Sequence, residues 1–302
     1  MKYEHEVRNA KEKAMQLMTD AGASPGRHHE YPEPAMSLDR QYATGLSRDR
    51  IEAALVAAGL DLDHLQRADL APLEDFHTMG RIATSQLAEL AAIERSDEVL
   101  DAGSGVGGTA RYLAGQFGCR VTAVDLTAEY CDTSRWLNRL VGLDGYIAVQ
   151  HGDVTDLPFH SASFTVVFSQ HVQMNVAGKA RLYDEARRVL RARGRLAIWD
   201  IVAGTPGELD FPLPWADQPA LSHLASADQL RATIESAGFS VTHWSDMTED
   251  ALTIMEIFLS APPGPLGLHI FVDRFAEKAN NLVRGLSSGR LRAMQAVAEA
   301  RT

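Results

Sequence analysis

A glycine-rich turn is the first feature of the sequence that could bind a ligand. Gly103, Gly105 and Gly108 follow the apolar residues 98–102 directly, and a helical pattern begins near Thr109. Glycine lets the backbone turn tightly and approach a ligand without an intervening Cβ, while a helix N-terminus presents free N–H groups. In this strand–turn–helix context, the G-x-G-x-x-G spacing predicts a site for a dinucleotide or for S-adenosyl-L-methionine.

Three aspartates near the ends of predicted strands help to choose between these cofactors. Asp125 ends the second strand, where a carboxylate accepts hydrogen bonds from both ribose hydroxyls of either cofactor. Asp101 precedes the first glycine, where an acid repels a pyrophosphate but suits the cationic methionine end of a sulfonium cofactor. Asp153 follows the third strand and can accept from the adenine amino group, with Val154 or Leu157 packing on the ring. Together these positions favour S-adenosyl-L-methionine.

These residues resemble the class I S-adenosylmethionine-dependent methyltransferases over roughly residues 95–245. The motifs that carry the resemblance are 99–108, Asp125, Gly152-Asp153, Leu157-Pro158-Phe159, 164–167 and 189–196. Within that family, the chain is similar to the small-molecule group that includes sarcosine/dimethylglycine N-methyltransferases and tocopherol- and sterol-type C-methyltransferases. The resemblance implies seven strands with an antiparallel last strand, and 240–246 fits the final hairpin.

The resemblance also implies which residues contact the cofactor. They are Gly103, Gly105, Asp125, Asp153 and either Ser169 or Gln170, just after the fourth strand. We add Asp101, Leu126 and Val154 to these contacts. In relatives, the segment that approaches the first core helix lies over the cofactor, which implies that His77 closes the site from above.

The elements that position these residues alternate between short apolar runs and helical patterns from Asp97 onward. This alternation predicts an α/β, doubly wound, Rossmann-like fold with a mostly parallel sheet. The predicted strands are 98–102, 120–125, 146–151, 164–169, 195–200 and 240–246. The predicted helices are 1–22, 48–59 with Ser47 as its cap, 77–92, 109–116, 128–141, 179–191 and 228–237. Residues 23–42 are predicted to form a long loop.

Three regions follow from this pattern. We expect a helical cap or lid over 1–92, a cofactor-binding α/β core over 93–247, and a C-terminal segment over 248–302. A Pro-rich insertion, 205–220, interrupts the core, and the C-terminal segment has helical character. The insertion and the C-terminal segment either face the substrate or simply cover the sheet, and the sequence leaves both alternatives open.

The acceptor side needs alignment and exclusion of water more than a protein nucleophile, because the sulfonium already activates the methyl carbon. His171 follows the fourth strand at the carboxyl edge of the sheet, which makes it the best candidate for a general base. A histidine that only packs or contacts the cofactor is the alternative. Related isoprenoid C-methyltransferases place a glutamate near here, whereas this chain has Gln170, His171 and Gln173, which makes a carbocation route less favoured.

Three more residues are candidates for acceptor binding. Asn175 lies in the same run as His171, Trp199 ends the fifth strand, and Trp215 lies in the Pro-rich insertion. Aromatic faces could enclose an apolar ring or a methylated ammonium group. Core packing is the alternative for Trp199.

The composition is that of an ordinary globular protein. The 302 residues are 45% hydrophobic and 23% charged, with a formal net charge of -11 that gives no electrostatic reason to bind nucleic acid. Cys119 and Cys131 are too few for a zinc site or a disulfide framework, which indicates a reducing cytoplasm. The mixed charges of residues 1–20 do not fit a signal peptide, and no stretch approaches the ~20 apolar residues of a membrane span.

The sequence therefore predicts methyl transfer to O or N of a small metabolite in the cytoplasm, with S-adenosyl-L-homocysteine as the product. We expect no metal, because no Asp or Asn pair follows Asp200, and we expect neither nucleic acid nor membrane as a partner. The sequence leaves open whether the protein forms a homodimer. The alternative functions are C-methylation of an isoprenoid or aromatic acceptor, an NAD-dependent reductase, and a non-catalytic cofactor-binding subunit.

Overall fold

A computed structural model of the chain describes residues 41–302. The helix predicted over 1–22 and nearly all of the loop predicted over 23–42 lie outside the described residues. The last two residues of that loop, Gln41 and Tyr42, are helical.

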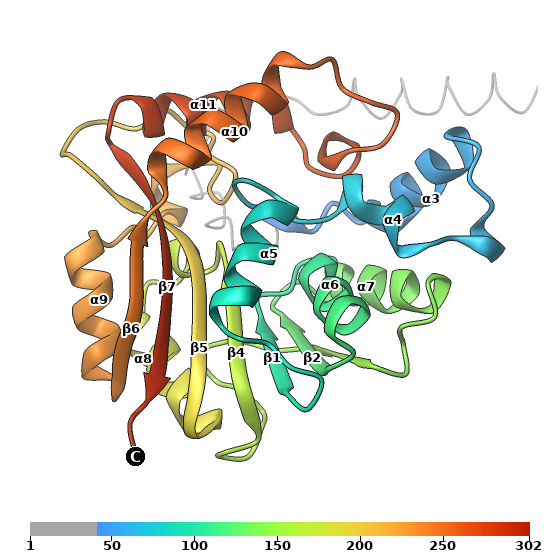
Figure 1. Ribbon diagram of the computed structural model, residues 1–302. Coiled ribbons are helices and arrows are strands. Elements are labelled where there is room, and N and C mark those ends of the chain that lie inside the picture. Colours follow the sequence, from blue (N-terminus) through green and yellow to red (C-terminus); the bar gives the residue numbers. More distant parts are fainter. Residues whose placement is uncertain (1–40) are drawn as a thin grey trace, which may run out of the picture. The chain divides into compact units, whose positions relative to one another are not determined.

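A seven-stranded sheet with strand order β3-β2-β1-β4-β5-β7-β6 forms the centre of the fold (Figure 1). Its strands are β1 Glu98–Ala102, β2 Arg120–Asp125, β3 Ile147–His151, β4 Phe164–Gln170, β5 Leu190–Ala203, β6 Phe239–Asp246 and β7 Leu291–Ala300. The first five strands pair in parallel, and β7 is antiparallel to both of its neighbours. The predicted fold class is confirmed.

Helices cover both faces of this sheet. They are α3 Ser47–Ala57, α4 Arg67–Leu70, α5 Arg81–Leu90, α6 Gly108–Phe117, α7 Ala128–Leu140, α8 Lys179–Val189, α9 Ala227–Ser236, α10 Thr248–Ser260 and α11 Phe275–Ser287. Val99 of β1 packs in the cluster that contains buried residues of α5, α6 and α11, while its neighbour Leu100 packs in the cluster with α8 and α9. Strands buried on both faces read as continuous apolar runs, which explains why the sequence revealed them.

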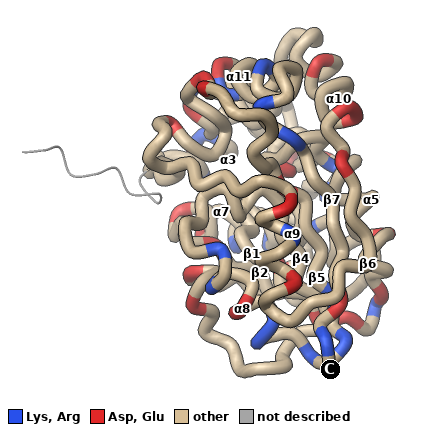
Figure 2. The backbone as a smooth tube through the Cα atoms, turned by 90° about the vertical axis from the view of Figure 1, so that its left-hand side faces the viewer, with Lys and Arg blue, Asp and Glu red and all other residues tan. Residues whose placement is uncertain are grey.

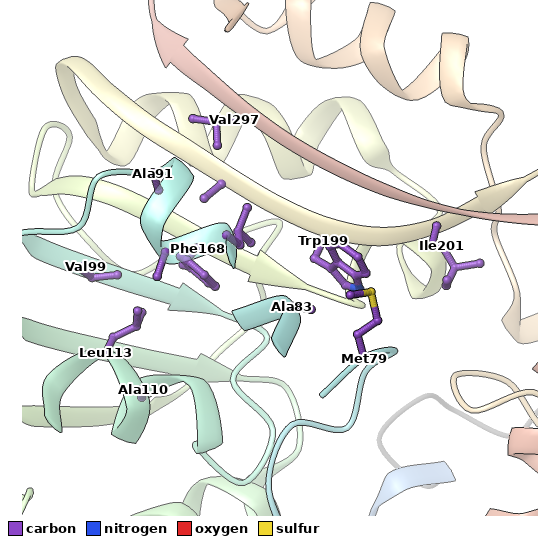
Figure 3. Packing of buried hydrophobic residues seen from close by; sticks show 14 of the residues in the cluster. Met79, Ala83, Ala91, Val99, Ala110, Leu113, Phe168, Trp199, Ile201 and Val297 are labelled. Atoms are coloured by element: carbon purple, nitrogen blue, oxygen red, sulfur yellow. The ribbon is translucent and has the colours of Figure 1, made fainter. Parts of the chain in front are cut away.

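The cluster that contains Val99 extends across the sheet from β1 to Val297 of β7. Figure 3 shows Val99, Phe168 and Trp199 along the sheet, with Met79 of the segment that leads into α5 and Ala83 of α5 itself packed in the same cluster. This packing fixes the approach segment over the carboxyl ends of the strands.

The prediction for the C-terminal segment was wrong in one part. The segment over 248–302 includes the helices α10 and α11, but its last portion is the strand β7, inserted between β5 and β6. Residues 291–300 are rich in Ala, Met, Gln and Glu, which favour helix in isolation. Hydrogen bonds on both edges and nearly complete burial override that preference here.

Two helix starts also differ from the prediction. Ser47 is the first residue of α3 and not its cap, since the Glu129 carboxylate accepts the backbone N–H groups of Gly45 and Ser47 instead. The helix predicted from His77 begins at Arg81, because Met79 and Gly80 have positive φ angles of 62° and 49° that no α-helix accommodates.

No helix within residues 41–302 is long and apolar enough to cross a membrane. Figure 2 shows Lys and Arg positions spread over many elements of the described chain, with Asp and Glu positions between them.

Candidate active site

A cavity of about 410 Å³ lies at the carboxyl ends of β1, β2 and β4. This is the edge where open α/β sheets bind their ligands. Twelve of the predicted site residues line it: His77, Asp101, Gly103, Gly105, Asp125, Leu126, Asp153, Val154, Gln170, His171, Asn175 and Trp215. The structure therefore brings most of the predicted site together from distant parts of the chain.

Two predicted residues, Ser169 and Trp199, do not line the cavity. Ser169 is buried in β4, whereas its neighbour Gln170 reaches the cavity. Trp199 is fully buried in the core, and its indole N–H donates to Thr78 Oγ1 at 2.8 Å. Trp199 therefore cannot enclose an acceptor directly.

The glycine turn needs its glycines for two different reasons. Gly103 and Gly105 have φ angles of 82° and 53°, in the left-handed region that side chains disfavour. A Cβ on Gly103 would lie 2.3 Å from Val172 Cγ2, while a Cβ on Gly105 would meet no atom within 4 Å. Gly103 therefore allows Val172 to pack closely against the turn. Gly105 leaves open space in the cavity, and we call this space the cradle.

Asp125 is held by the turn that it faces. Its two carboxylate oxygens accept the backbone N–H groups of Gly105 and Thr127, each at 2.8 Å. Burial raises the pKa of the Asp125 carboxyl above its usual value, and these two backbone donors oppose the shift. The carboxylate is thus fixed in place beside the cradle.

Among residues 41–302, the buried Oδ2 of Asp101 has no hydrogen-bond partner. Burial raises the pKa of this carboxyl to about 7, and the nearby Asp125 adds to the shift. A cationic ligand group would offset the energetic cost of burying the charged carboxylate and the repulsion from Asp125. The unpartnered Asp101 oxygen and the open cradle at Gly105 therefore fit a cofactor with a cationic amino-acid end.

Asp153 also lines the cavity. Its Oδ1 accepts the backbone N–H and the hydroxyl of Thr155, both at 2.8 Å, which leaves Oδ2 for a ligand. Leu126 and Val154 line the same part of the cavity. A carboxylate oxygen between apolar side chains suits an amino-substituted aromatic ring.

His171 lies where β4 ends, with a left-handed φ of 55°. Its Nε2 receives the backbone N–H of Thr78 at 3.3 Å and lies 3.1 Å from Thr78 Oγ1. Burial lowers the pKa of His171 well below its usual value, and His77, whose ring centroid is 5.9 Å away, lowers it further. The imidazole is therefore neutral near pH 7.

Asn175 connects two walls of the cavity. Its Nδ2 donates to the Trp215 carbonyl at 2.6 Å, and its Oδ1 accepts the Tyr42 hydroxyl at 3.0 Å. The Trp215 indole N–H donates to Ser222 at 3.0 Å. Asn175 therefore fixes the Pro-rich insertion against the start of the described chain.

An aromatic wall on the acceptor side was missed at the sequence level. Its residues come from five separate segments: Tyr42, Phe76, Tyr130, Trp215 and Phe271. Of these, only Trp215 was singled out, because no spacing along the chain connects the others.

A buried ionic network behind the cavity was also missed. Arg81 donates to Glu74 at 2.6 Å and to Asp75 at 2.7 Å, and the fully buried Arg111 pairs with Glu74 and donates to Asn138 at 3.0 Å. Among these residues, Asp75 lines the cavity. The adjacent acids Glu74 and Asp75, directly after the apolar residues 70–73, are the one signal that the sequence offered.

The fold and the site define an S-adenosylmethionine-binding domain, and comparison with known proteins agrees. Residues 100–198 match the family model described as a methyltransferase domain. The chain is 29% identical over 220 residues to a sarcosine/dimethylglycine N-methyltransferase of Halorhodospira halochloris, covering 72% of this chain and 77% of that protein.

One further relative supports the same class, and one solved structure shares the fold. A glycine/sarcosine/dimethylglycine N-methyltransferase of Actinopolyspora halophila is 30% identical over 178 residues, which cover 59% of this chain but only 32% of that protein. A geranyl diphosphate C-methyltransferase structure from Streptomyces coelicolor has a TM-score of 0.62 at 18% identity, with 89% of this chain and 99% of that chain covered, and shows the shared fold. This chain carries an S-adenosylmethionine-dependent methyltransferase domain, and the predicted family and cofactor are confirmed.

Proposed function

We propose that the protein transfers a methyl group from S-adenosyl-L-methionine to O or N of a small metabolite and releases S-adenosyl-L-homocysteine. The observation that carries the proposal is one cavity whose lining combines the glycine turn and three aspartates with aromatic side chains and His171. A cofactor and an acceptor can therefore meet without crossing bulk water.

The cofactor-binding residues follow from the chemistry of the lining. Asp101 would receive the cationic amino-acid end, Asp125 the ribose hydroxyls, and Asp153 the adenine amino group between Leu126 and Val154. When bound, the cofactor supplies a methyl group already activated by a sulfonium centre.

The acceptor side supplies shape and exclusion of water. Tyr130, Trp215 and Phe271 present an apolar wall, and Asn175 holds the Trp215 loop in place. Enclosure of this kind aligns the acceptor and keeps water from competing for the methyl group. The described part of the predicted cap, 1–92, contributes Tyr42 and His77 to this enclosure, and the region 248–302 contributes Phe271.

The buried carboxylate of Asp101 favours methyl transfer over the alternative of an NAD-dependent reductase. Its unpartnered oxygen lies in the cavity just before the glycine turn, where a pyrophosphate would be repelled. The relatives include N-, O- and C-methyltransferases, so similarity to them does not identify the atom that is methylated. Transfer to O or N is therefore our proposal.

We propose that the protein acts in the cytoplasm, supported by its two free, buried cysteines, and without nucleic acid, supported by the net charge of -11. A homodimer is the alternative to a monomer, and sedimentation of the full chain distinguishes the two.

Transfer of labelled methyl groups tests the proposal. The full chain is incubated with methyl-labelled S-adenosyl-L-methionine and a fraction of small metabolites rich in amines, phenols and other hydroxyl compounds. We expect label in low-molecular-weight products bonded through O or N, and much less of it with Asp125→Ala at the same cofactor concentration. Label found only in macromolecules would contradict the small-molecule acceptor.

A further inference from the structure

Two donors of Thr78 meet one nitrogen of His171. The Thr78 backbone N–H donates to His171 Nε2 at 3.3 Å, and the Thr78 hydroxyl oxygen lies 3.1 Å from the same atom. A backbone N–H is only a donor, which means that Nε2 must offer its lone pair. The proton of the neutral imidazole is therefore on Nδ1.

Trp199 determines how the Thr78 hydroxyl is used. The fully buried Trp199 donates its indole N–H to Thr78 Oγ1 at 2.8 Å, and an indole N–H is likewise only a donor. The hydroxyl oxygen thus accepts from Trp199, and its hydrogen is directed to His171 Nε2. Trp199, Thr78 and His171 form a chain of hydrogen bonds with one consistent direction.

The other nitrogen of His171 is available to a ligand. Among residues 41–302, Nδ1 has no hydrogen-bond partner, and the ring lines the cavity. The neighbouring titratable group is His77, whose Nδ1 lies 3.3 Å from the Thr78 carbonyl and whose Nε2 lies 3.2 Å from Thr84 Oγ1 and 3.7 Å from Asp75 Oδ1. Both ring nitrogens of His77 thus lie near protein oxygens. Of the two histidines, it is therefore His171 that presents a free N–H to the cavity.

The backbone of His171 is held in an uncommon conformation. Its φ is 55°, its N–H donates to the Trp199 carbonyl at 2.8 Å, and the next N–H, of Val172, donates to Asp200 at 2.8 Å. A left-handed residue other than glycine costs conformational energy and persists where the surroundings impose it. Both ends of this turn are thus fixed on β5, and the ring direction is fixed with them.

We propose that His171 binds the methyl acceptor as a hydrogen-bond donor through Nδ1–H, with Thr78 and Trp199 as positioning residues that fix this tautomer. The inference rests on the proposed function for the presence of an acceptor. It replaces the predicted role of His171 as a general base, because protonated His171 would turn an Nε2–H toward the Thr78 N–H.

The proposal narrows the acceptor class. The acceptor presents an oxygen or nitrogen lone pair to Nδ1–H, and its methylated atom is nucleophilic at neutral pH without help from this histidine. A neutral amine or an already ionised hydroxyl meets both conditions.

Nitrogen NMR of the full chain tests the tautomer without any acceptor. The His171 signal is assigned by its loss in His171→Asn. We expect the neutral Nδ1–H form from pH 6 to 8 in the unmodified protein. In Thr78→Val and Trp199→Phe the Thr78 backbone N–H still donates to Nε2 but the directed hydroxyl is lost, and we expect a smaller excess of the Nδ1–H form, with the excess restored in Thr78→Ser. A neutral Nε2–H form, or titration of His171 near pH 7, overturns the proposal.

Methyl transfer by two variants tests the role. Asparagine tolerates a left-handed backbone and places an amide donor near the position of Nδ1. We expect His171→Asn to keep turnover within about tenfold of the unmodified chain, with the same pH profile, and His171→Ala to fall well below it. His160→Asn, the same change at an exposed histidine, is the matched control.

Equal loss in His171→Asn and His171→Ala would contradict the donor role. The proposed function fails separately, if the unmodified chain binds no cofactor and transfers no methyl group, and the NMR result stands in either case.

Discussion

The backbone N–H of Gly105 donates to Asp125 Oδ2 at 2.8 Å, joining the glycine turn to the end of the neighbouring strand β2. The other Asp125 oxygen accepts the Thr127 N–H, and the carboxylate is therefore oriented before any ligand binds. An oriented carboxylate keeps its remaining lone pairs for ribose hydroxyls at little further cost in entropy.

Removing this carboxylate should weaken cofactor binding strongly. Asp125→Ala deletes a charge-assisted pair of ligand hydrogen bonds, and we expect a loss of about 2 to 4 kcal/mol in the binding of S-adenosyl-L-homocysteine. Calorimetry measures the loss, with Asp144→Asn, at an exposed aspartate, as the control. Unchanged affinity in Asp125→Ala would overturn the ribose assignment.

The glycine cradle gives a second prediction. Gly105→Ala adds a methyl group in open space but at a φ of 53°, which should cost about 1 kcal/mol of stability. The same methyl group enters the cofactor cradle, and we expect cofactor affinity to fall at least tenfold while the fold survives. Gly145→Ala, which also meets no atom within 4 Å, should change neither quantity. Normal affinity in Gly105→Ala would place the cofactor elsewhere.

Asp101 should make cofactor binding depend on pH. Its pKa of about 7, raised by burial and then by Asp125, with Asp75 raising and Arg111 lowering it, means that the carboxyl becomes neutral as pH falls below 7. Affinity for the cationic end of S-adenosyl-L-homocysteine should then fall by up to about tenfold per pH unit. Calorimetry between pH 5.5 and 8.5 measures this slope.

The matched variant isolates the contribution of Asp101. Asp101→Asn should bind more weakly at pH 8 and lose this part of the pH dependence. If the slope is unchanged in Asp101→Asn, another group titrates and the assignment of the amino-acid end is wrong.

The sequence predicted the cofactor side of the site better than the acceptor side. Asp101, Asp125 and Gly105 are close to the ends of consecutive strands, where the parallel topology alone brings them to one edge. Tyr42, Phe271 and the rest of the aromatic wall meet only through tertiary packing, which leaves no spacing along the chain to read.

Two errors have the same physical origin. The strand β7, Leu291–Ala300, has residues that favour helix, and its burial between β5 and β6 decides its conformation. Trp199 was predicted to contact the acceptor, yet its ring is buried and acts on the cavity only through Thr78. In both cases the deciding partners are far away in the sequence.

Asp200 should make stability depend on pH. Burial raises the pKa of this carboxyl to about 8, while its Oδ1 accepts the Val172 N–H and its Oδ2 has no partner. The unfolded pKa is about 3.9, which means that the folded state binds more protons between these values and the free energy of unfolding falls as pH rises toward 8. Below pH ~4 the carboxyl is protonated in both states, so the contribution of Asp200 to stability is at its highest and no longer changes with pH.

Asp200→Asn should remove that slope. We expect the variant to be more stable than the unmodified chain at pH 9, by about 1 to 3 kcal/mol, with a smaller difference near pH 5. Urea unfolding at the two pH values measures the difference, and Asp144→Asn serves again as the exposed control. A variant that is less stable at pH 9 would show that the Asp200 charge is compensated in the folded protein.

Cofactor binding by the unmodified full chain tests the central claim most directly. Titration calorimetry with S-adenosyl-L-homocysteine and, separately, with NADH compares the two cofactors that the glycine turn alone would fit. We expect saturable one-to-one binding of S-adenosyl-L-homocysteine and no measurable binding of NADH. Binding of NADH without binding of S-adenosyl-L-homocysteine would contradict it.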